Sequence, residues 1–215
     1  EAEMRALTLE IVVDAIFHST VADEMDQIRT AMSELAQTTT QQSLNTALAL
    51  LPDSAPLPLM RRKRRASATL DAIVYRIIRE RRPAAADHGD LLSMFMLVED
   101  EDGQPMSDQQ LRDEVMTIFI AGHETTATTL AWALVLLAQH PSVYAQLQAE
   151  LSRVLAGRRP SLLDLPNLMY TGSIIKETLR LYPPVWLILR QAEVGFPLGP
   201  YYVPRGSGIW ISLYT

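Results

Sequence analysis

One long helical segment constrains the fold of this chain more than any other feature of its sequence. Ser107-Asp-Gln-Gln110 is typical of a capping box, in which the serine caps free helix amides and the glutamine bonds back. No proline follows until Pro141, which forces a stop at His140. The segment predicts a helix of about 32 residues, on the order of 48 Å long. Such a helix would cross a whole globular domain.

The same segment leaves a membrane-spanning alternative open, because residues 115–138 are mostly apolar. Glu124 would then lie near the middle of the span, where a charge costs roughly 2.5–3.5 kcal/mol. The flanking segments have the pattern of ordinary helices of soluble proteins. We therefore expect a helix inside a protein, and dependence on detergent would indicate the alternative.

The rest of the chain predicts a mainly α fold with a small β-sheet late in the sequence. Apolar residues spaced by three to four predict further helices over residues 4–17, 21–51, 61–82, 90–98, 143–155 and 168–181. Beyond Pro183 and Pro184 the period changes, and β-type runs follow at residues 185–189, 201–203 and 209–213.

These elements predict that residues 1–215 form part of a single domain. The helical body would cover residues 1–184, and short β segments would cover residues 185–215. The sequence begins without an initiating Met and stops directly after a predicted strand. We therefore expect the fold to be incomplete at both ends.

Charge and cysteine content exclude several classes of function. The net charge is −6, so nucleic acid is not an expected partner. The basic run at residues 61–65 could indicate a nucleic-acid or membrane surface, but in an acidic chain we interpret it as the solvated start of a helix. The absence of cysteine excludes disulfide, zinc-thiolate and cysteine-nucleophile chemistry within these residues.

The stretch AGHETTATTL, residues 121–130, puts polar side chains in the middle of the long apolar helix. A zinc motif is excluded, because it needs His-Glu-x-x-His and the fifth position here is Ala127. The threonines could instead be a plain interruption of a core helix, each bonding the carbonyl one turn back. Small Gly122 followed by an acid and an alcohol also suits a flat ligand lying against the helix. The residues alone leave both interpretations open.

A second polar pair follows about 50 residues later. Glu177 and Arg180 are spaced at i and i+3, on one helix face. Their neighbours are apolar, which suggests a buried pair. Such a pair alone is more often structural than functional.

Together the two motifs, in this order, resemble the cytochrome P-450 superfamily of haem-thiolate monooxygenases over nearly all of the chain. AGHETT, residues 121–126, resembles the long distal helix that crosses the haem, and Glu177-Thr-Leu-Arg180 resembles the family's Glu-x-x-Arg helix. The intervening residues 139–143 and 165–170 also fit. Either motif alone would be a weak signal, whereas the pair is quite specific.

The resemblance implies roles for individual residues. Glu124 and Thr125 match the acid–alcohol pair that delivers protons to bound dioxygen, while Ala121, Gly122 and Thr126 match the groove for oxygen and substrate. Arg190 falls where many members place an arginine on a haem propionate. Glu177 and Arg180 match the structural pair.

The sequence departs from the family in that it has no cysteine, so no axial metal ligand lies in this chain, and the upstream helix that usually supplies other haem contacts is not found either. The resemblance implies that the full-length parent binds haem b and inserts one oxygen atom of dioxygen into a small apolar substrate. Electrons would come from an electron-transfer protein or a reductase domain. We expect a cytoplasmic protein, of which this fragment alone is inactive.

A non-catalytic helical scaffold or interaction protein that keeps the fold without haem is the alternative. Sequence beyond Thr215 discriminates between the two, because a haem-binding loop with a cysteine would support the enzyme. The identity of the substrate cannot be inferred, since residues 21–82 are generic in composition.

The missing thiolate generates a first prediction. The purified 215-residue chain has no cysteine, and a thiolate holds the haem iron in this family. We expect no thiolate-type Soret band when the chain is mixed with haem, reduced and exposed to carbon monoxide. The band's appearance with this chain alone would contradict the prediction.

Overall fold

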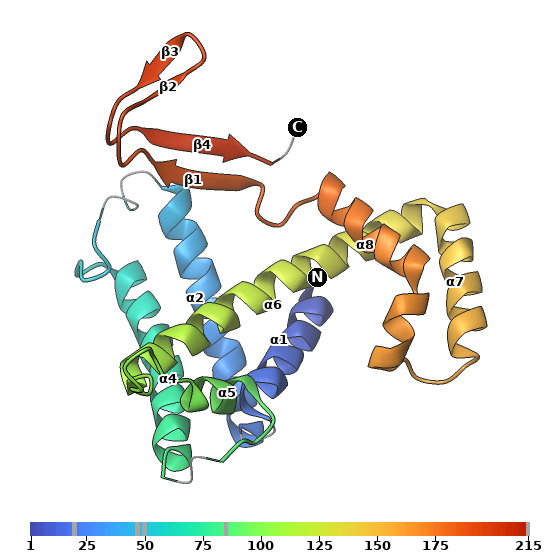
Figure 1. The fold of residues 1–215 in the computed structure, drawn as a ribbon, viewed down its shortest axis with the longest axis horizontal. Coiled ribbons are helices and arrows are strands. Elements are labelled where there is room, and N and C mark those ends of the chain that lie inside the picture. Colours follow the sequence, from blue (N-terminus) through green and yellow to red (C-terminus); the bar gives the residue numbers. More distant parts are fainter. Residues whose placement is uncertain (19–20, 46–47, 49–50, 84–85, 214–215) are drawn as a thin grey trace. The chain divides into compact units, whose positions relative to one another are not determined.

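The computed structural model describes residues 1–18, 21–45, 48, 51–83 and 86–213. Contacts divide the chain into two compact units, residues 2–124 and residues 125–215 with Glu1, and each is described by itself. The boundary falls inside the helix α6 (Asp108–Gln139), which is drawn in green to yellow in Figure 1. The expectation of a single domain therefore stays a prediction.

The long helix is confirmed, with 32 residues. The Ser107 amide donates to Gln110 Oε1 over 2.9 Å, and the Gln110 amide donates to Ser107 Oγ over 3.3 Å, so the capping box forms as expected. Among the described residues, no helix is both long and apolar enough to cross a bilayer. The membrane-spanning alternative for α6 is therefore not supported.

The first unit is an assembly of helices around one apolar core. Its elements are α1 (Ala2–Phe17), η1 (Ala22–Glu24), α2 (Met25–Leu44), α4 (Pro58–Arg81), α5 (Leu91–Leu97) and the first part of α6. Helix α2 packs along α4, and α1 packs against α5. The rings of Phe17 and Phe119 meet edge to face at 6.4 Å between centroids. This contact ties α1 to α6 in the middle of the core.

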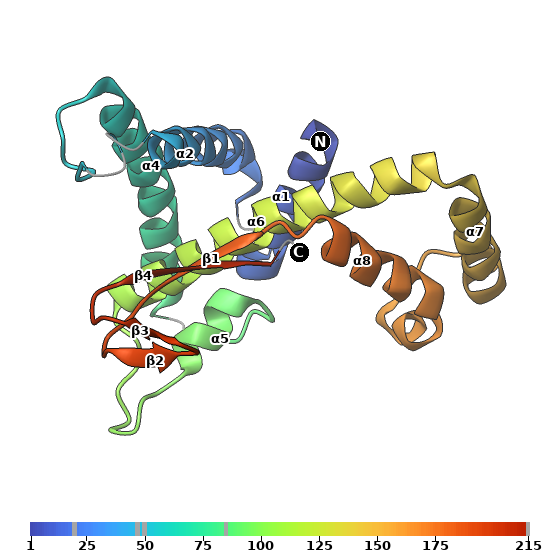
Figure 2. The ribbon, with the colours of Figure 1, turned by 90° about the horizontal axis from the view of Figure 1, so that it is seen from above.

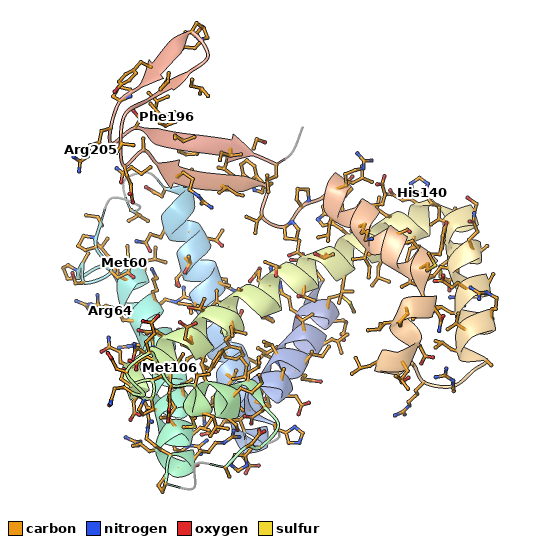
Figure 3. The ribbon with its side chains drawn as sticks, viewed as in Figure 1. Met60, Arg64, Met106, His140, Phe196 and Arg205 are labelled. Carbon is orange, nitrogen blue, oxygen red and sulfur yellow. The ribbon has the colours of Figure 1, made fainter. Side chains whose placement is uncertain are left out.

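The basic run opens α4, as expected. Pro58 occupies the first turn, where its missing amide proton costs nothing. Figure 3 labels Met60, whose side chain is fully buried, and Arg64 one turn further on. The guanidinium of Arg64 donates to the carbonyl oxygens of Asp53 and Ala55. Arg64 of the basic run thus bonds the loop that precedes the helix, which fits the start of a solvated helix.

A buried ion pair, not foreseen from the sequence, connects the end of α4 to the start of α5. Arg81 Nη1 lies 2.5 Å from Asp90 Oδ2, with side chains 8% and 1% exposed. Asp90 also caps α5, because its other oxygen accepts from the Ser93 amide at 2.9 Å and the Ser93 hydroxyl at 2.6 Å. Burial alone would raise the pKa of Asp90, but the bonds from Ser93 and Arg81 lower it below its usual value.

The expected helix over residues 21–51 is confirmed over residues 25–44 and is wrong at its end. Helix α2 ends at Leu44, and Asn45 adopts an extended conformation with ψ 106°. Residues 46–47 and 49–50 of the expected helix lie outside the described residues. The Thr-Thr-Thr-Gln-Gln stretch did not break the helix: Thr38 bonds the Glu34 carbonyl at 2.7 Å, which satisfies its hydroxyl without leaving the helix.

The second unit contains the remainder of α6, two further α-helices and the strands. Helix α7 (Pro141–Leu155) begins on a proline, and the residue that caps its end, Ala156, takes the left-handed conformation at φ 50°. The 3-10 helix η2 (Leu162–Asn167), absent from our expectations, leads into α8 (Met169–Leu181). Figure 2 shows α7 and α8 side by side, in agreement with their direct contact.

A carboxylate of α7 caps α8. Glu150 accepts from the backbone amides of Tyr170 and Thr171, at 2.7 and 2.8 Å, and from the Thr171 hydroxyl at 2.7 Å. These amides lack partners within their own helix. Burial alone would raise the pKa of Glu150, but these bonds lower it. The cap fixes the start of the helix that carries Glu177 and Arg180.

Two antiparallel strand pairs complete the unit, so the expected late β structure is confirmed. Strand β1 (Leu187–Gln191) pairs with β4 (Gly208–Ser212), with Leu189 opposite Trp210. Strand β2 (Phe196–Leu198) pairs with β3 (Tyr201–Val203), and Figure 3 labels Phe196 in this hairpin. We missed β2 because its central residue is Pro197, which interrupts the sequence pattern of a strand. Residues 214–215, the end of the expected last segment, lie outside the described residues.

The Arg81–Asp90 pair generates a stability prediction. Asp90→Ala leaves Arg81 buried without a counter-charge, which costs about 3–5 kcal/mol of unfolding free energy, measured by urea unfolding. Because the folded-state pKa of Asp90 is lowered from 3.8, the pair's contribution is present above about pH 4 and declines as the pH falls further.

Asp53→Ala is the matched control, because Asp53 pairs with Lys63 and is 55% exposed. Exposed pairs contribute about 0–1 kcal/mol. A loss for Asp90→Ala no larger than for Asp53→Ala would show that the buried pair is not needed for stability.

Candidate functional site

The polar stretch of α6 divides into a part that faces α1 and a part that faces a groove. The α1-facing part comprises residues 122–124. A Cβ atom added to Gly122 would lie 3.3 Å from Val12 Cγ2, so the missing side chain lets the two helices approach closely. His123 is 6% exposed, and its Nε2 lies 3.1 Å from the Arg5 carbonyl. Glu124 Oε1 forms an ion pair with Arg5 Nη2 at 2.7 Å.

Thr125 lines a groove within the second unit. The groove has a volume of about 480 Å³. Its lining is formed by α6, α8 and the segment after α8, with residues Thr125, Thr126, Thr129, Ile175, Leu179, Pro183, Pro184 and Val185. Threonine residues of α6 thus form one wall, and aliphatic and proline residues form the other. The Thr129 hydroxyl donates to the Thr125 carbonyl at 2.9 Å, as expected of a helix threonine.

The predicted site residues therefore distribute unevenly. Thr125 and Thr126 line the groove, whereas Gly122 faces Val12 of α1 and Ala121 is exposed. Glu124 lines a different pocket, of about 270 Å³, together with Arg5, His123 and residues of α1 and α2. Successive residues on a helix point about 100° apart, which explains why Glu124 and Thr125 do not line one cavity. The roles of these residues stay predictions.

Glu177 and Arg180 form the expected pair, but it is not buried. Arg180 donates from Nε and Nη2 to the two Glu177 oxygens at 2.8 and 2.7 Å, a bidentate geometry. Their side chains are 54% and 67% exposed. The bond from Arg180 lowers the pKa of Glu177, and the same bond raises the pKa of Arg180.

The pair is exposed in the 215-residue chain for a physical reason, whereas its burial in the full-length protein stays a prediction. We inferred it from apolar neighbours, but two of these, Ile175 and Leu179, are each 42% exposed. Apolar residues beside a pair indicate burial only if another element covers that face, and the described residues supply no such cover. Arg190 is likewise exposed on β1, where its Nη1 donates to the Leu189 carbonyl at 2.9 Å. Its contact with a propionate stays a prediction.

Two further features of the second unit were not found from the sequence. A pocket of about 360 Å³ lies among α6, α7 and α8 and includes His140 and Glu177 in its lining. Figure 3 labels His140 at the junction of α6 and α7. The rings of Trp132 and Tyr182 stack at 4.0 Å, with 5° between their planes. Both features need side chains from separate helices, so no local pattern signals them.

The residues of α1 that hold α6 were also missed. Arg5 and Thr8 lie more than 100 positions before their partners, since Thr8 donates to the His123 carbonyl across 115 residues. One local signal existed, because Thr8 is a polar residue beside the buried Leu9 and Val12.

Comparison with known proteins identifies the family. Residues 2–215 match the family model described as Cytochrome P450. The chain therefore belongs to the cytochrome P450 family, whose iron is held by a cysteine thiolate. The structure is similar to the haem domain of cytochrome P450DA, with a TM-score of 0.84 and 29% identity over 99% of this chain and 46% of that chain.

Bacterial relatives are similar over almost the whole of this chain. Cyclooctat-9-en-7-ol 5-monooxygenase from Streptomyces melanosporofaciens is 40% identical over 97% of this chain and 46% of that protein. Pentalenene oxygenase from Streptomyces avermitilis is 34% identical over 98% of this chain and 46% of that protein. The chain thus spans about half the length of the curated relatives that it matches.

The exposed Glu177–Arg180 pair generates a prediction that differs between the 215-residue chain and the full-length protein. In the 215-residue chain, Arg180→Ala should leave the unfolding midpoint unchanged, because exposed pairs contribute little. In the full-length protein, we expect the same substitution to yield little haem-loaded protein, as the family resemblance implies. The measurements are urea unfolding of the chain and haem absorbance per protein for the parent. Normal haem content in the full-length variant would show that the pair is a mere surface contact.

Proposed function

We propose that the full-length protein is a haem-dependent monooxygenase that inserts one oxygen atom of dioxygen into an apolar organic substrate. The observation that carries the proposal is the groove in which Thr125 and Thr126 face an apolar wall from residues 183–185. Family membership supports the same reading. The alternative, a scaffold without haem, has no comparable support, because both bacterial relatives are named as oxygenases.

The groove suits the face of a flat, apolar macrocycle. One wall is the small-residue side of a helix, and the opposite wall carries two prolines and aliphatic groups without a charged side chain. The chain does not supply the axial thiolate, since it contains no cysteine. We propose that Thr125, Thr126 and Val185 would contact the haem region, with Arg190 on a propionate, and that the axial ligand lies outside these 215 residues.

When bound, the haem would supply the activation of dioxygen, which the side chains of this chain cannot perform because none is a redox centre. The residues of the chain would handle protons. Thr125, which lines the groove, would take part in proton transfer with a neighbouring water. The Glu124 side chain is 39% exposed. Glu124 would act as the acid of the pair and Thr125 as its alcohol, as the family resemblance implies.

The substrate class follows from the groove and the relatives. The groove wall is apolar, and the relatives are named after pentalenene and cyclooctat-9-en-7-ol, an unsaturated hydrocarbon and an unsaturated alcohol. We propose a largely hydrocarbon substrate of similar polarity. An electron-transfer protein or reductase domain would supply the two electrons. The cytoplasmic location stays a prediction.

Thr125→Ala in the full-length protein tests the proposed relay. Losing a positioned proton donor costs roughly 10²–10⁴-fold in the assisted step. Substrate affinity and haem content should persist, because the methyl group keeps the apolar contact. We expect less product per reducing equivalent and more peroxide.

Thr129→Ala is the matched control, because Thr129 lines the same groove but has no proposed contact with haem or substrate. The Thr129 hydroxyl is already bonded to the Thr125 carbonyl. If Thr125→Ala couples oxygen consumption to product as well as the parent does, the proton relay is wrong, and the threonines are a plain interruption of a core helix.

A further inference from the structure

Three polar contacts join α1 to a single turn of α6. The Thr8 hydroxyl lies 3.1 Å from the His123 carbonyl, and the His123 Nε2 lies 3.1 Å from the Arg5 carbonyl. Arg5 Nη2 then pairs with Glu124 Oε1 at 2.7 Å. All three contacts lie within the first unit, where Gly122 and Val12 bring the two backbones close together.

The geometry fixes the proton on the buried imidazole. A backbone carbonyl accepts but cannot donate, so the His123 Nε2 must carry a proton to bond the Arg5 carbonyl. Burial lowers the pKa of His123, and the bond to the Arg5 carbonyl and the charge of Glu124 offset this only in part. His123 is therefore a neutral donor at pH 7, in the Nε2–H form.

Arg5 is held at both ends. Its carbonyl accepts from His123, and its guanidinium binds Glu124. An ion pair with both side chains 39% exposed ordinarily contributes little, because two long side chains must be ordered. Fixing the backbone of Arg5 on the neighbouring residue of α6 restricts where its guanidinium can reach.

We propose that His123 is a positioning residue: its Nε2–H anchors Arg5, and Arg5 in turn sets the position of the Glu124 carboxylate. This inference rests on the proposed function, because it assigns His123 a task in the proton relay. The family resemblance assigns roles to Glu124 and Thr125 only. His123 would act on Glu124 indirectly, through Arg5 of α1.

The charges around the anchor predict its behaviour in acid. Arg5 and Glu124 face the imidazole, and Arg29 of α2 lines the same pocket. Arg29 itself pairs with Glu10 and Asp26. Because the folded-state pKa of His123 is lowered from 6.5, acid below that pH protonates the unfolded chain first. A buried imidazolium would lie beside the Arg5 cation, so the stability of the folded chain should decline as the pH falls below about 6.5, while the folded state keeps the neutral imidazole to a lower pH.

A spectroscopic test addresses the anchor without relying on turnover. The full-length protein, labelled with ¹⁵N-histidine, is titrated by NMR, and the His123 signals are assigned by their loss in His123→Gln. We expect the neutral Nε2–H tautomer at pH 7, persisting below pH 6.5. A signal from the Nδ1–H tautomer, or from an imidazolium at pH 7, would overturn the proposal.

Substitutions then test the positioning role. His123→Leu removes the donor but keeps a buried apolar side chain, whereas His123→Gln keeps an N–H donor. A displacement of about 1 Å at a catalytic group can cost 10²-fold, so we expect His123→Leu to lower the proton-assisted rate by up to about 100-fold. The expected readout is more peroxide per product, with His123→Gln close to the parent. The double variant His123→Leu/Arg5→Gln should be no worse than the more impaired single variant, because both disrupt one linkage.

His88→Leu is the matched control, since His88 is exposed in the same unit. All variants are compared at equal haem content, which separates misfolding from misplacement. If Glu124→Gln uncouples the reaction but His123→Leu does not, the proposed function stands and the positioning role is wrong. If Glu124→Gln couples normally, the acid has no role, and both the relay and its anchor are overturned.

Discussion

The continuity of α6 is the constraint on which the candidate site depends. One helix of 32 residues contributes to both compact units, and their boundary falls between Glu124 and Thr125. A helix has no freedom to turn one side chain toward its neighbour, because each residue is fixed about 100° from the last. Glu124 therefore contacts α1, and Thr125 lines the groove.

Part of this arrangement could be predicted from the sequence because its causes are local. The capping box at Ser107 and the stop at Pro141 set the bounds of α6 within a few residues. The i and i+3 spacing of Glu177 and Arg180 likewise guaranteed their contact. Their exposure could not be predicted, because burial depends on which other element covers a face. Spacing along a helix predicts which side chains can contact each other, but it does not predict whether another element covers them.

The contacts that the sequence did not predict connect residues far apart in the chain or in different elements. Arg81 and Asp90 are separated by a loop, and Arg5 and His123 are separated by 118 positions. A lone arginine, histidine or glutamate in a helix pattern is compatible with a surface position, so its burial carries no local signature. The missed strand β2 has a different cause, because Pro197 is a poor strand former by every sequence rule.

The Glu150 cap has a mechanical consequence for α8. Two backbone amides at the start of α8 donate to the same carboxylate of α7. If α8 slid along its own axis, both hydrogen bonds would break. Glu150 thus acts as an axial stop, and one turn of slip would move the helix by about 5.4 Å. Because these polar bonds hold the position of α8 along its axis, substitutions on its aliphatic face should not shift the helix. The cap thereby also fixes the position of Arg180 along the axis of α8.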